Sequence, residues 1–279
     1  MITFNDIGGY GRLGNQLFQY SILKAISLKR GYDIVLPSNT FDKVWHGQKC
    51  KLNNFSLPSC EFSDVNFKHT FQESHNKNRT FLPSVFDVED DTNLKGFFQN
   101  INYYKDIREV LLKEFEIVSK YEDFAKEYLN KFSNTTVSLH VRRGDVTDGT
   151  NHNREWLNTY DNNSKLKKYH DYVFSKIPQD STILLFTGGS RHKDDYSDDL
   201  QWCKNNIKDE RIIFVNDVDD METFSIIKNV DINITSFDST FSWWASYLNK
   251  NNNVFAPSSF DGVGNIKNED IYPDYWKIV

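Results

Sequence analysis

The chain has 279 residues, of which 38% are hydrophobic and 15% aromatic, and its formal net charge is −6. This length allows one large domain or two smaller ones, and the acidic balance argues against a general nucleic-acid-binding surface. The three cysteines are too few for a disulfide framework and none has zinc-ligand spacing, which indicates a reducing compartment. They are Cys50, Cys60 and Cys203.

The amino terminus begins directly with a strand-like run, without the charged and apolar regions of a signal peptide. No apolar run approaches the about 20 residues that a membrane-spanning helix needs. We therefore expect a soluble, cytoplasmic protein with no integral membrane segment.

Short apolar runs alternate with longer amphipathic ones along the chain, and this alternation is typical of parallel βαβ units. The expected strands are Ile2–Phe4, Ile34–Leu36, Val137–Val141, Ile183–Thr187, Ile212–Val215, Ile232–Ile234 and Val254–Ala256. The expected helices are Gln16–Lys29, Ile107–Phe132, Leu166–Lys176, Leu200–Asn206, Met221–Lys228 and Ser242–Asn249.

A break in this pattern separates two halves. Residues 38–100 are polar and weakly periodic, and we expect them to be irregular. The helical stretch 107–132 then leads into the next strand. We therefore place an amino-terminal α/β domain at residues 1–132 and a carboxyl-terminal one at 133–262, with the tail 263–279 packing back on the first.

A glycine-rich loop follows the first expected strand and opens the first expected helix. Gly9, Gly11 and Gly14 have the Gly-x-Gly-x-x-Gly spacing, which suits a tight turn and close approach of the backbone to a phosphate. An NAD-type oxidoreductase using the Gly9–Gly14 loop is one reading. It would need an acidic residue at the end of the second strand, where the sequence has Pro37 and Ser38. A turn that only reverses the chain is the other reading.

The strand at 137–141 carries a histidine and ends in two arginines, a glycine and an aspartate, Asp145. Planar guanidinium groups at the carboxyl end of a parallel strand suit a diphosphate. Because strand side chains alternate, His140 and Arg142 share one face while Arg143 faces the other. We expect one arginine to bind the ligand and the other to brace the site. Alternatively, Arg143-Gly144-Asp145 is an exposed adhesion loop.

Hydroxyl residues follow the strand at 232–234, just before a helix. Ser239 and Thr240 suit either phosphate binding at a helix amino end or ordinary helix capping. Trp243 and Trp244 are expected to pack in the core.

Acidic residues occur in two further places. Asp217 and Asp219 follow the strand at 212–215, and such a pair can hold a divalent metal in a metal-dependent glycosyltransferase. The acidic run that includes Asp198 and Asp199 is expected to be a solvated loop.

Four segments, in the expected order along the chain, together resemble the α-1,2-fucosyltransferases of glycosyltransferase family 11. Gly11–Tyr20 is similar to the opening motif of that family, and His140–Asp145 is similar to its His-x-Arg-Arg-Gly-Asp motif. Ser239–Leu248 is similar to its carboxyl-terminal motif, and Trp202-Cys203-Lys204 to a further segment.

The resemblance implies an α/β, GT-B-like fold with two Rossmann-like domains facing a cleft, the first on the acceptor side and the second binding the nucleotide sugar. It implies inverting transfer of L-fucose from GDP-β-L-fucose to a galactoside-type oligosaccharide or polysaccharide, in α-1,2 linkage, for surface glycan synthesis. No metal or other cofactor is expected.

The resemblance also implies site residues. Arg142 and Arg143 would engage the diphosphate, with Ser239, Thr240 and Phe241 nearby. His140, Gly14, Asn15 and Gln16 would line the cleft, and the candidates for the general base are His140 and Asp145. The sequence departs from the family pattern at Asp238, where Asn is usual, and at Val146, where Tyr is usual.

Overall fold

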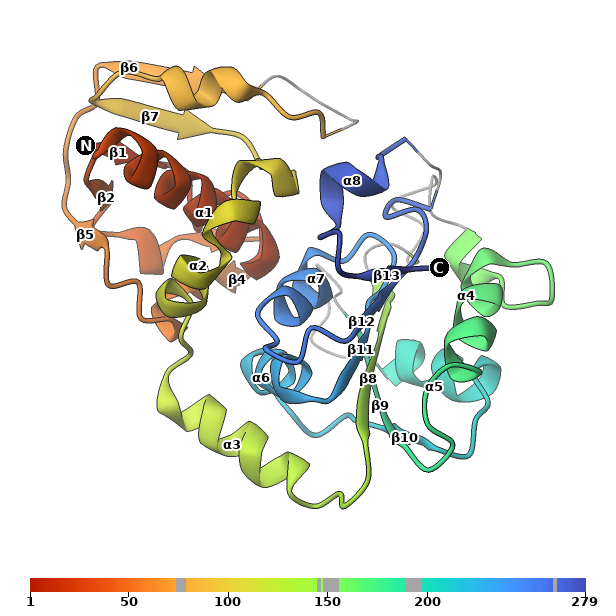
Figure 1. The fold of residues 1–279 in the computed structure, drawn as a ribbon. Coiled ribbons are helices and arrows are strands. Elements are labelled where there is room, and N and C mark those ends of the chain that lie inside the picture. The colour runs from red at the N-terminus through yellow and green to blue at the C-terminus, as the bar shows by residue number, and fades with distance from the viewer. Residues whose placement is uncertain (74–78, 145–146, 148–155, 189–196, 263–264) are drawn as a thin grey trace. The chain divides into compact units, whose positions relative to one another are not determined.

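The chain folds into two units, each built on its own parallel sheet, in a computed structural model (Figure 1). The structure describes residues 1–73, 79–144, 147, 156–188, 197–262 and 265–279. The first unit comprises residues 1–118 and 265–274, and the second comprises 119–264 and 275–279. The α/β class predicted from the sequence is confirmed for both.

The first unit has a five-stranded sheet in the order β5-β2-β1-β7-β6, with every neighbouring pair parallel. Its strands are β1 (Ile2–Thr3), β2 (Ile34–Leu36), β5 (Cys60–Phe62), β6 (His69–Gln72) and β7 (Thr92–Lys95). A short antiparallel hairpin, β3 (Val44–Trp45) and β4 (Gln48–Lys49), lies outside this sheet. The helices are α1 (Leu13–Arg30), α2 (Arg108–Glu114), α8 (Asn268–Ile271) and the 3-10 turns η1 (Thr40–Asp42), η2 (Leu52–Asn54), η3 (Pro83–Asp87), η4 (Ile101–Tyr103) and η5 (Lys105–Ile107).

The prediction that residues 38–100 are irregular is wrong, because this region supplies β5, β6 and β7. Its strands carry polar residues instead of apolar runs. Thr92 and Asn93 of β7 are nonetheless buried, since the Thr92 hydroxyl donates to Glu89 O and the Asn93 side chain accepts from the Asn5 amide. Hydrogen bonds within the fold thus make polar side chains compatible with a central strand.

The second unit has a six-stranded parallel sheet in the order β10-β9-β8-β11-β12-β13. Its strands are β8 (Thr136–Arg142), β9 (Thr182–Gly188), β10 (Ile212–Phe214), β11 (Ile232–Ile234), β12 (Val254–Ala256) and β13 (Lys277–Ile278). Its helices are α3 (Ser119–Leu129), α4 (Lys165–Phe174), α5 (Ser197–Asn206), α6 (Asp220–Asn229) and α7 (Thr240–Tyr247). All five strands expected in this region form. β9 is continuously apolar over residues 183–186, as is typical of a buried parallel strand, whereas β8 alternates apolar residues with Ser138 and His140.

The strand order of the second sheet runs outward from β8 in both directions. It reaches β9 and β10 on one side and β11, β12 and β13 on the other, which is the 3-2-1-4-5-6 order of a doubly wound fold. The direction of winding reverses between β8 and β11. Ligands of such sheets bind at this switch point, outside the carboxyl ends of the strands.

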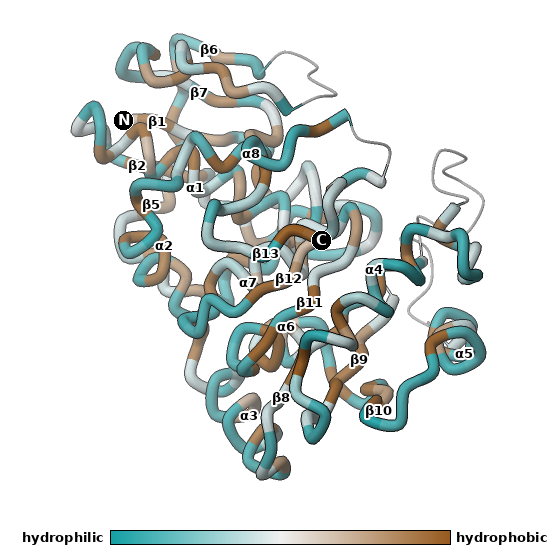
Figure 2. Tube along the Cα trace, turned by 45° about the vertical axis from the view of Figure 1, so that its right-hand side comes forward, coloured by the Kyte–Doolittle hydropathy of each residue, from teal (hydrophilic) through white to brown (hydrophobic). Residues whose placement is uncertain are grey.

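The two faces of the second sheet are covered by different helices, with α4 and α5 on one side and α6 and α7 on the other (Figure 1). Val137, Leu139 and Val141 of β8 face a buried cluster that includes residues of α4 and α5. The strands at the centre of this sheet are largely hydrophobic (Figure 2). Trp243 and Trp244 of α7 are fully buried, which confirms the core packing expected for them.

The helix expected at 107–132 is interrupted, and this moves the boundary between the units. Residues 115–118 leave the helical path because backbone groups here bond to the segment 54–57 instead. Leu57 N donates to Glu114 O, Ser56 N donates to Glu116 O, and Val118 N donates to Asn54 O. At residue 119 the chain enters the second unit, where α3 packs on α6. The division therefore lies after Val118 instead of after residue 132, and only 265–274 of the tail groups with the first unit.

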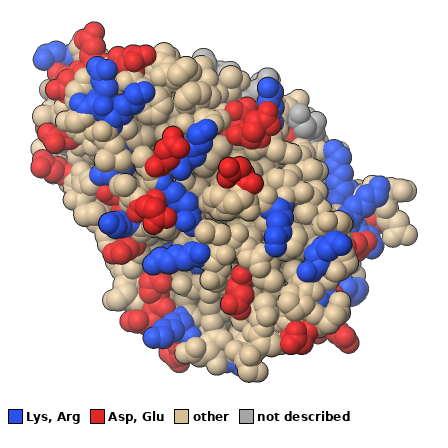
Figure 3. Space-filling view, viewed as in Figure 1, with Lys and Arg blue, Asp and Glu red and all other residues tan. Residues whose placement is uncertain are grey.

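Within the described residues, no helix is long and apolar enough to cross a membrane. On the face shown in Figure 3, acidic and basic side chains are interspersed, without a continuous basic stripe.

Candidate functional site

The carboxyl ends of β8 and β11 meet at the switch point of the second sheet, and the candidate residues gather there. Arg142 ends β8, and its backbone amide donates to the Ser236 hydroxyl at 2.8 Å. Its guanidinium donates to the backbone carbonyl of Asp238 in the loop between β11 and α7. The half-buried Arg142 side chain is thus held beside the amino end of α7, where the helix dipole is positive.

Ser239, Thr240 and Phe241 form the start of α7. Ser239 is the N-cap, and its hydroxyl accepts from the Ser242 amide at 3.2 Å, as in the capping alternative considered for it. Phe241 lies against His140 with ring centroids 5.9 Å apart, and edge-on to Phe224 of α6 at 5.3 Å. Ser236, which fixes the Arg142 backbone, was not among the residues predicted from the sequence.

Asp238 lies in a left-handed backbone conformation with φ +48°. Asn and Asp enter this region far more readily than other residues with a side chain. Asp238 therefore preserves the turn that the usual Asn of the family motif would make, and the turn presents its carbonyl to Arg142. The backbone conformation therefore explains why Asp can stand in place of Asn here, although a carboxylate charge close to a diphosphate is unfavourable.

His140 is buried on the same side of β8 as Arg142, as the strand alternation predicts. Burial, with the nearby Arg142 charge, lowers the pKa of His140 to about 3, so its ring is neutral at pH 7. Among the described residues its Nδ1 atom has no hydrogen-bond partner. An uncharged imidazole facing the Arg142 side of the sheet can exchange a hydrogen bond with a ligand, but it is a weak general base.

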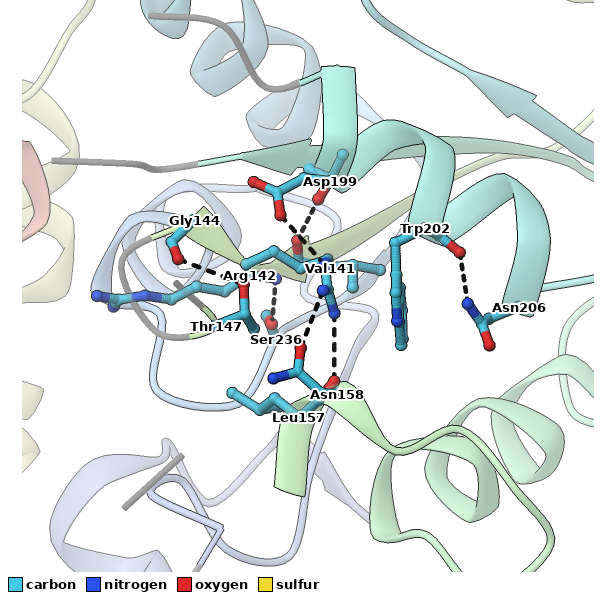
Figure 4. Close-up of polar contacts among 12 residues, drawn as sticks. Val141, Arg142, Gly144, Thr147, Leu157, Asn158, Asp199, Trp202, Asn206 and Ser236 are labelled. Atoms are coloured by element: carbon cyan, nitrogen blue, oxygen red, sulfur yellow. Dashed lines mark hydrogen bonds and ion pairs between the residues drawn. The ribbon is translucent and has the colours of Figure 1, made fainter. Parts of the chain in front are cut away.

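Arg143 projects to the other face of the sheet and is almost completely enclosed, with 7% of its side chain exposed. Its Nε donates to Asp199 of α5 at 3.2 Å, and its two terminal nitrogens donate to Leu157 O and Asn158 Oδ1 at 3.2 and 3.0 Å. The guanidinium also stacks 3.7 Å from the ring centroid of Trp202. In Figure 4 the Arg142 side chain extends away from Asp199, Asn158 and Trp202.

The structure thus gives the two arginines different surroundings. Arg143 connects β8 to α5 and to the segment 157–158, as expected of an arginine that braces the site, while its contact with a diphosphate stays a prediction. Burial raises the pKa of Asp199, and the Arg143 charge opposes this rise. The prediction of a solvated loop is wrong for Asp199, whose side chain is 14% exposed and forms this ion pair.

The turn after Arg143 favours a glycine, since Gly144 has φ +60°. Thr147 N donates to the Gly144 carbonyl at 3.0 Å. Asp145, the other candidate for the general base, and Val146 lie outside the described residues, so their roles stay predictions.

The remaining predicted residues lie in the first unit, at the start of α1. Gly14 is buried in the first turn. Gln16 is 1% exposed, and its side chain donates to Gly11 O and accepts from Lys51 N. Asn15 is partly exposed and accepts from Gln99 at 2.6 Å. Gln16 therefore fixes the glycine-rich loop from inside.

Of the two aspartates considered for metal binding, Asp217 and Asp219, the second has a structural role. Asp219 is the N-cap of α6, where its carboxylate accepts from the Met221 and Glu222 amides in a full capping box. No cluster of three or more possible metal ligands occurs among the residues that the structure describes.

The family model of glycosyl transferase family 11 matches residues 1–278 of the chain. A galactoside alpha-(1,2)-fucosyltransferase 2 from Rattus norvegicus is 25% identical over 264 residues, which cover 89% of this chain and 67% of that protein. An alpha-1,2-colitosyltransferase from Escherichia coli is 25% identical over an alignment 292 positions long, which covers 95% of each of the two chains.

Solved structures share the fold at low identity. NodZ, an alpha-1,6-fucosyltransferase soaked with GDP-fucose, superposes with a TM-score of 0.53 at 10% identity, covering 88% of this chain and 91% of NodZ. POFUT1 in complex with GDP gives a TM-score of 0.52 at 11% identity, covering 88% of this chain and 93% of POFUT1. These similarities confirm the GT-B-like fold. The match along nearly the whole chain shows that it is a glycosyltransferase and belongs to glycosyl transferase family 11.

Proposed function

We propose that this glycosyltransferase moves L-fucose from GDP-β-L-fucose to a galactoside-type acceptor, in α-1,2 linkage, during surface glycan synthesis. The observation that carries the proposal is the position of Arg142, at the switch point of the second sheet and beside the amino end of α7. A guanidinium and a helix amino end both favour the negative charge of a diphosphate.

Three features of the second unit serve the reaction. Arg142 and the start of α7 hold the diphosphate, and they stabilise the charge that grows on GDP as the bond to fucose breaks. Such stabilisation acts on the transition state more than on the ground state. Neutral His140 orients the donor by a hydrogen bond, and Arg143 keeps the end of β8 in place.

The acceptor hydroxyl attacks the anomeric carbon of fucose from the face opposite GDP, which inverts the configuration. The hydroxyl must lose a proton in this step. The pKa of His140, about 3, makes it a poor acceptor of that proton near pH 7, so Asp145 is the better candidate for the general base. No metal ion takes part in this mechanism.

Thermal unfolding in EDTA tests the donor. The chain is measured with GDP, GDP-fucose, a UDP-sugar and NADH. A ligand at 100 times its Kd adds about 2.7 kcal/mol to the free energy of unfolding, so GDP and GDP-fucose should raise Tm by several degrees. Stabilisation by NADH alone would favour the oxidoreductase reading, and stabilisation by a UDP-sugar only after metal is restored would favour the metal-dependent one.

Turnover with lactose then tests the transfer. NMR of the product should show an α-fucosyl residue on the 2-position of galactose, as inversion of a β-linked donor requires. GDP-colitose is tested in parallel, because the colitosyltransferase matches 95% of both chains. Preferential use of GDP-colitose would replace fucose by colitose as the sugar transferred.

A further inference from the structure

Three partly exposed aromatic side chains lie together in the first unit. Tyr10 is in the loop after β1, and Phe97 is in the loop after β7. Their rings stack with centroids 4.6 Å apart and an interplanar angle of 20°. Trp45 of the β3–β4 hairpin meets Tyr10 edge-on at 5.2 Å. We call these three residues the aromatic platform.

The platform lies at the switch point of the first sheet. In the order β5-β2-β1-β7-β6, the chain winds outward from β1 to β2 and β5, and then returns on the other side with β6 and β7. Tyr10 and Phe97 follow the carboxyl ends of β1 and β7, the two strands between which the winding changes direction. This is the edge of a parallel sheet where ligands bind.

Buried hydrogen bonds hold the platform in place. The side-chain amide of Gln19, in the fully buried part of α1, donates to Tyr10 O at 3.0 Å and to Gly96 O at 3.2 Å. The hairpin that carries Trp45 turns through His46 and Gly47, both with positive φ. The backbone segments that carry the rings are therefore held before any ligand arrives, which reduces the entropic cost of binding.

The chemistry of this switch point disfavours a phosphate. The backbone amides of Phe97 and Phe98 already donate to the Glu73 carboxylate at 2.7 and 2.9 Å. That carboxylate would repel a second anion. Lys43 donates to the Asn5 carbonyl, and Lys95 lies 4.0 Å from Asp6. The neighbouring cations are thus engaged with groups of the protein.

Aromatic faces carry a negative quadrupole and attract the polarised C–H groups on one face of a pyranose ring. Galactose has such an apolar face, because its axial 4-hydroxyl leaves several C–H groups together on the opposite side. We infer that Tyr10, Trp45 and Phe97 form a stacking subsite for a galactose-type ring of the acceptor. The inference rests on the proposed function, since it assigns the acceptor of the same reaction.

Saturation-transfer NMR tests the subsite without turnover. Methyl β-galactoside is the probe, in the presence of GDP, with the wild type and with Trp45→Ala and Phe97→Leu. We expect the sugar signals to weaken strongly in both variants. With lactose as acceptor, KM for lactose should rise by on the order of tenfold, while KM for GDP-fucose stays unchanged.

Two further variants separate stacking from a structural role. Trp45→Phe keeps an aromatic face and should recover most of the lactose KM. Phe86→Ala is the matched control, because Phe86 is a partly exposed aromatic residue of the same unit. It lies in η3, with its ring centroid 4.5 Å from Lys29 Nζ in the last turn of α1.

Unchanged sugar signals in Phe97→Leu and Trp45→Ala would overturn the subsite, as would an equal rise in both KM values. If Trp45→Ala does not fold, Phe97→Leu alone decides, since leucine retains apolar volume without a ring face. Failure of the proposed function is distinguishable: GDP would not stabilise the wild type, whereas the NMR comparison of methyl β-galactoside binding would still report on the platform.

Discussion

The two units present the same kind of switch point with different chemistry. In the second unit, Arg142, the neutral ring of His140 and the amino end of α7 lie near the carboxyl ends of β8 and β11. In the first unit, the space between β1 and β7 carries stacked aromatic rings and backbone groups already bonded to Gln19 and Glu73. We therefore propose that topology determines where each unit binds its ligand, and that the loop residues determine which ligand it is.

The comparison also shows how each switch point is supported. Arg143 braces the second one through an ion pair with Asp199 and a stack on Trp202. Gln19 supports the first one through uncharged hydrogen bonds to two carbonyls. Variants of these supports should affect stability, while variants of the exposed groups should affect binding.

The largest effect is expected for Arg143→Ala. Removal of one member of a buried ion pair leaves the other charged and unpaired, so the free energy of unfolding should fall by about 3–5 kcal/mol. Urea denaturation measures this loss. The double variant Arg143→Met, Asp199→Leu should recover much of it, because no charge is then left without a partner. Arg143→Ala with unchanged stability but impaired GDP binding would place Arg143 on the diphosphate instead.

Arg142→Ala should act on turnover instead of stability. Loss of a single donor to a developing negative charge costs about 2–4 kcal/mol, so kcat/KM should fall by about 30- to 1000-fold. Tm should stay close to that of the wild type, and Arg142→Lys should be intermediate because it keeps the charge without the planar fork. Unchanged turnover in Arg142→Ala would remove this residue from the site.

A smaller effect is expected in the first unit for Gln19→Leu. The substitution leaves the Tyr10 and Gly96 carbonyls without their donor, which should cost about 1–3 kcal/mol of stability. Isothermal titration calorimetry of the variant with GDP should give the wild-type Kd. A marked weakening of GDP binding would contradict the assignment of the nucleotide to the second switch point.

The sequence predicts the second unit far better than the first, and the reason is burial. β9 is buried and continuously apolar over residues 183–186, and β8 and β11 carry buried apolar residues at alternate positions. A pattern of hydrophobic residues is therefore enough to find them. β5 and β6 are short edge strands with exposed residues, and β7 buries Thr92 and Asn93. Thr92 bonds to Glu89 three residues earlier, and Asn93 bonds to the distant Asn5. Such strands leave no periodic signal in the chain.

The same distinction applies to the site. Alternation along β8 predicted that the two arginines face opposite sides, because it depends only on local geometry. The partner of Arg143 could not be predicted, since Asp199 belongs to an acidic run that resembles solvated surface. The role of Asp238 depends on its backbone angle, which a comparison of residue types does not reveal.

The smallest effects are expected for Asp217 and Asp219, the acidic pair before α6. Variants of this pair test whether the second switch point works with a metal ion. Asp219→Ala removes the N-cap and should lower stability by about 1 kcal/mol, with kcat nearly unchanged. Asp219→Asn keeps an equally good cap and should be close to neutral, and Asp217→Asn should leave turnover intact with or without EDTA. A large loss of kcat in both Asn variants, restored by Mn²⁺, would instead make this pair a metal site and move part of the donor chemistry away from Arg142.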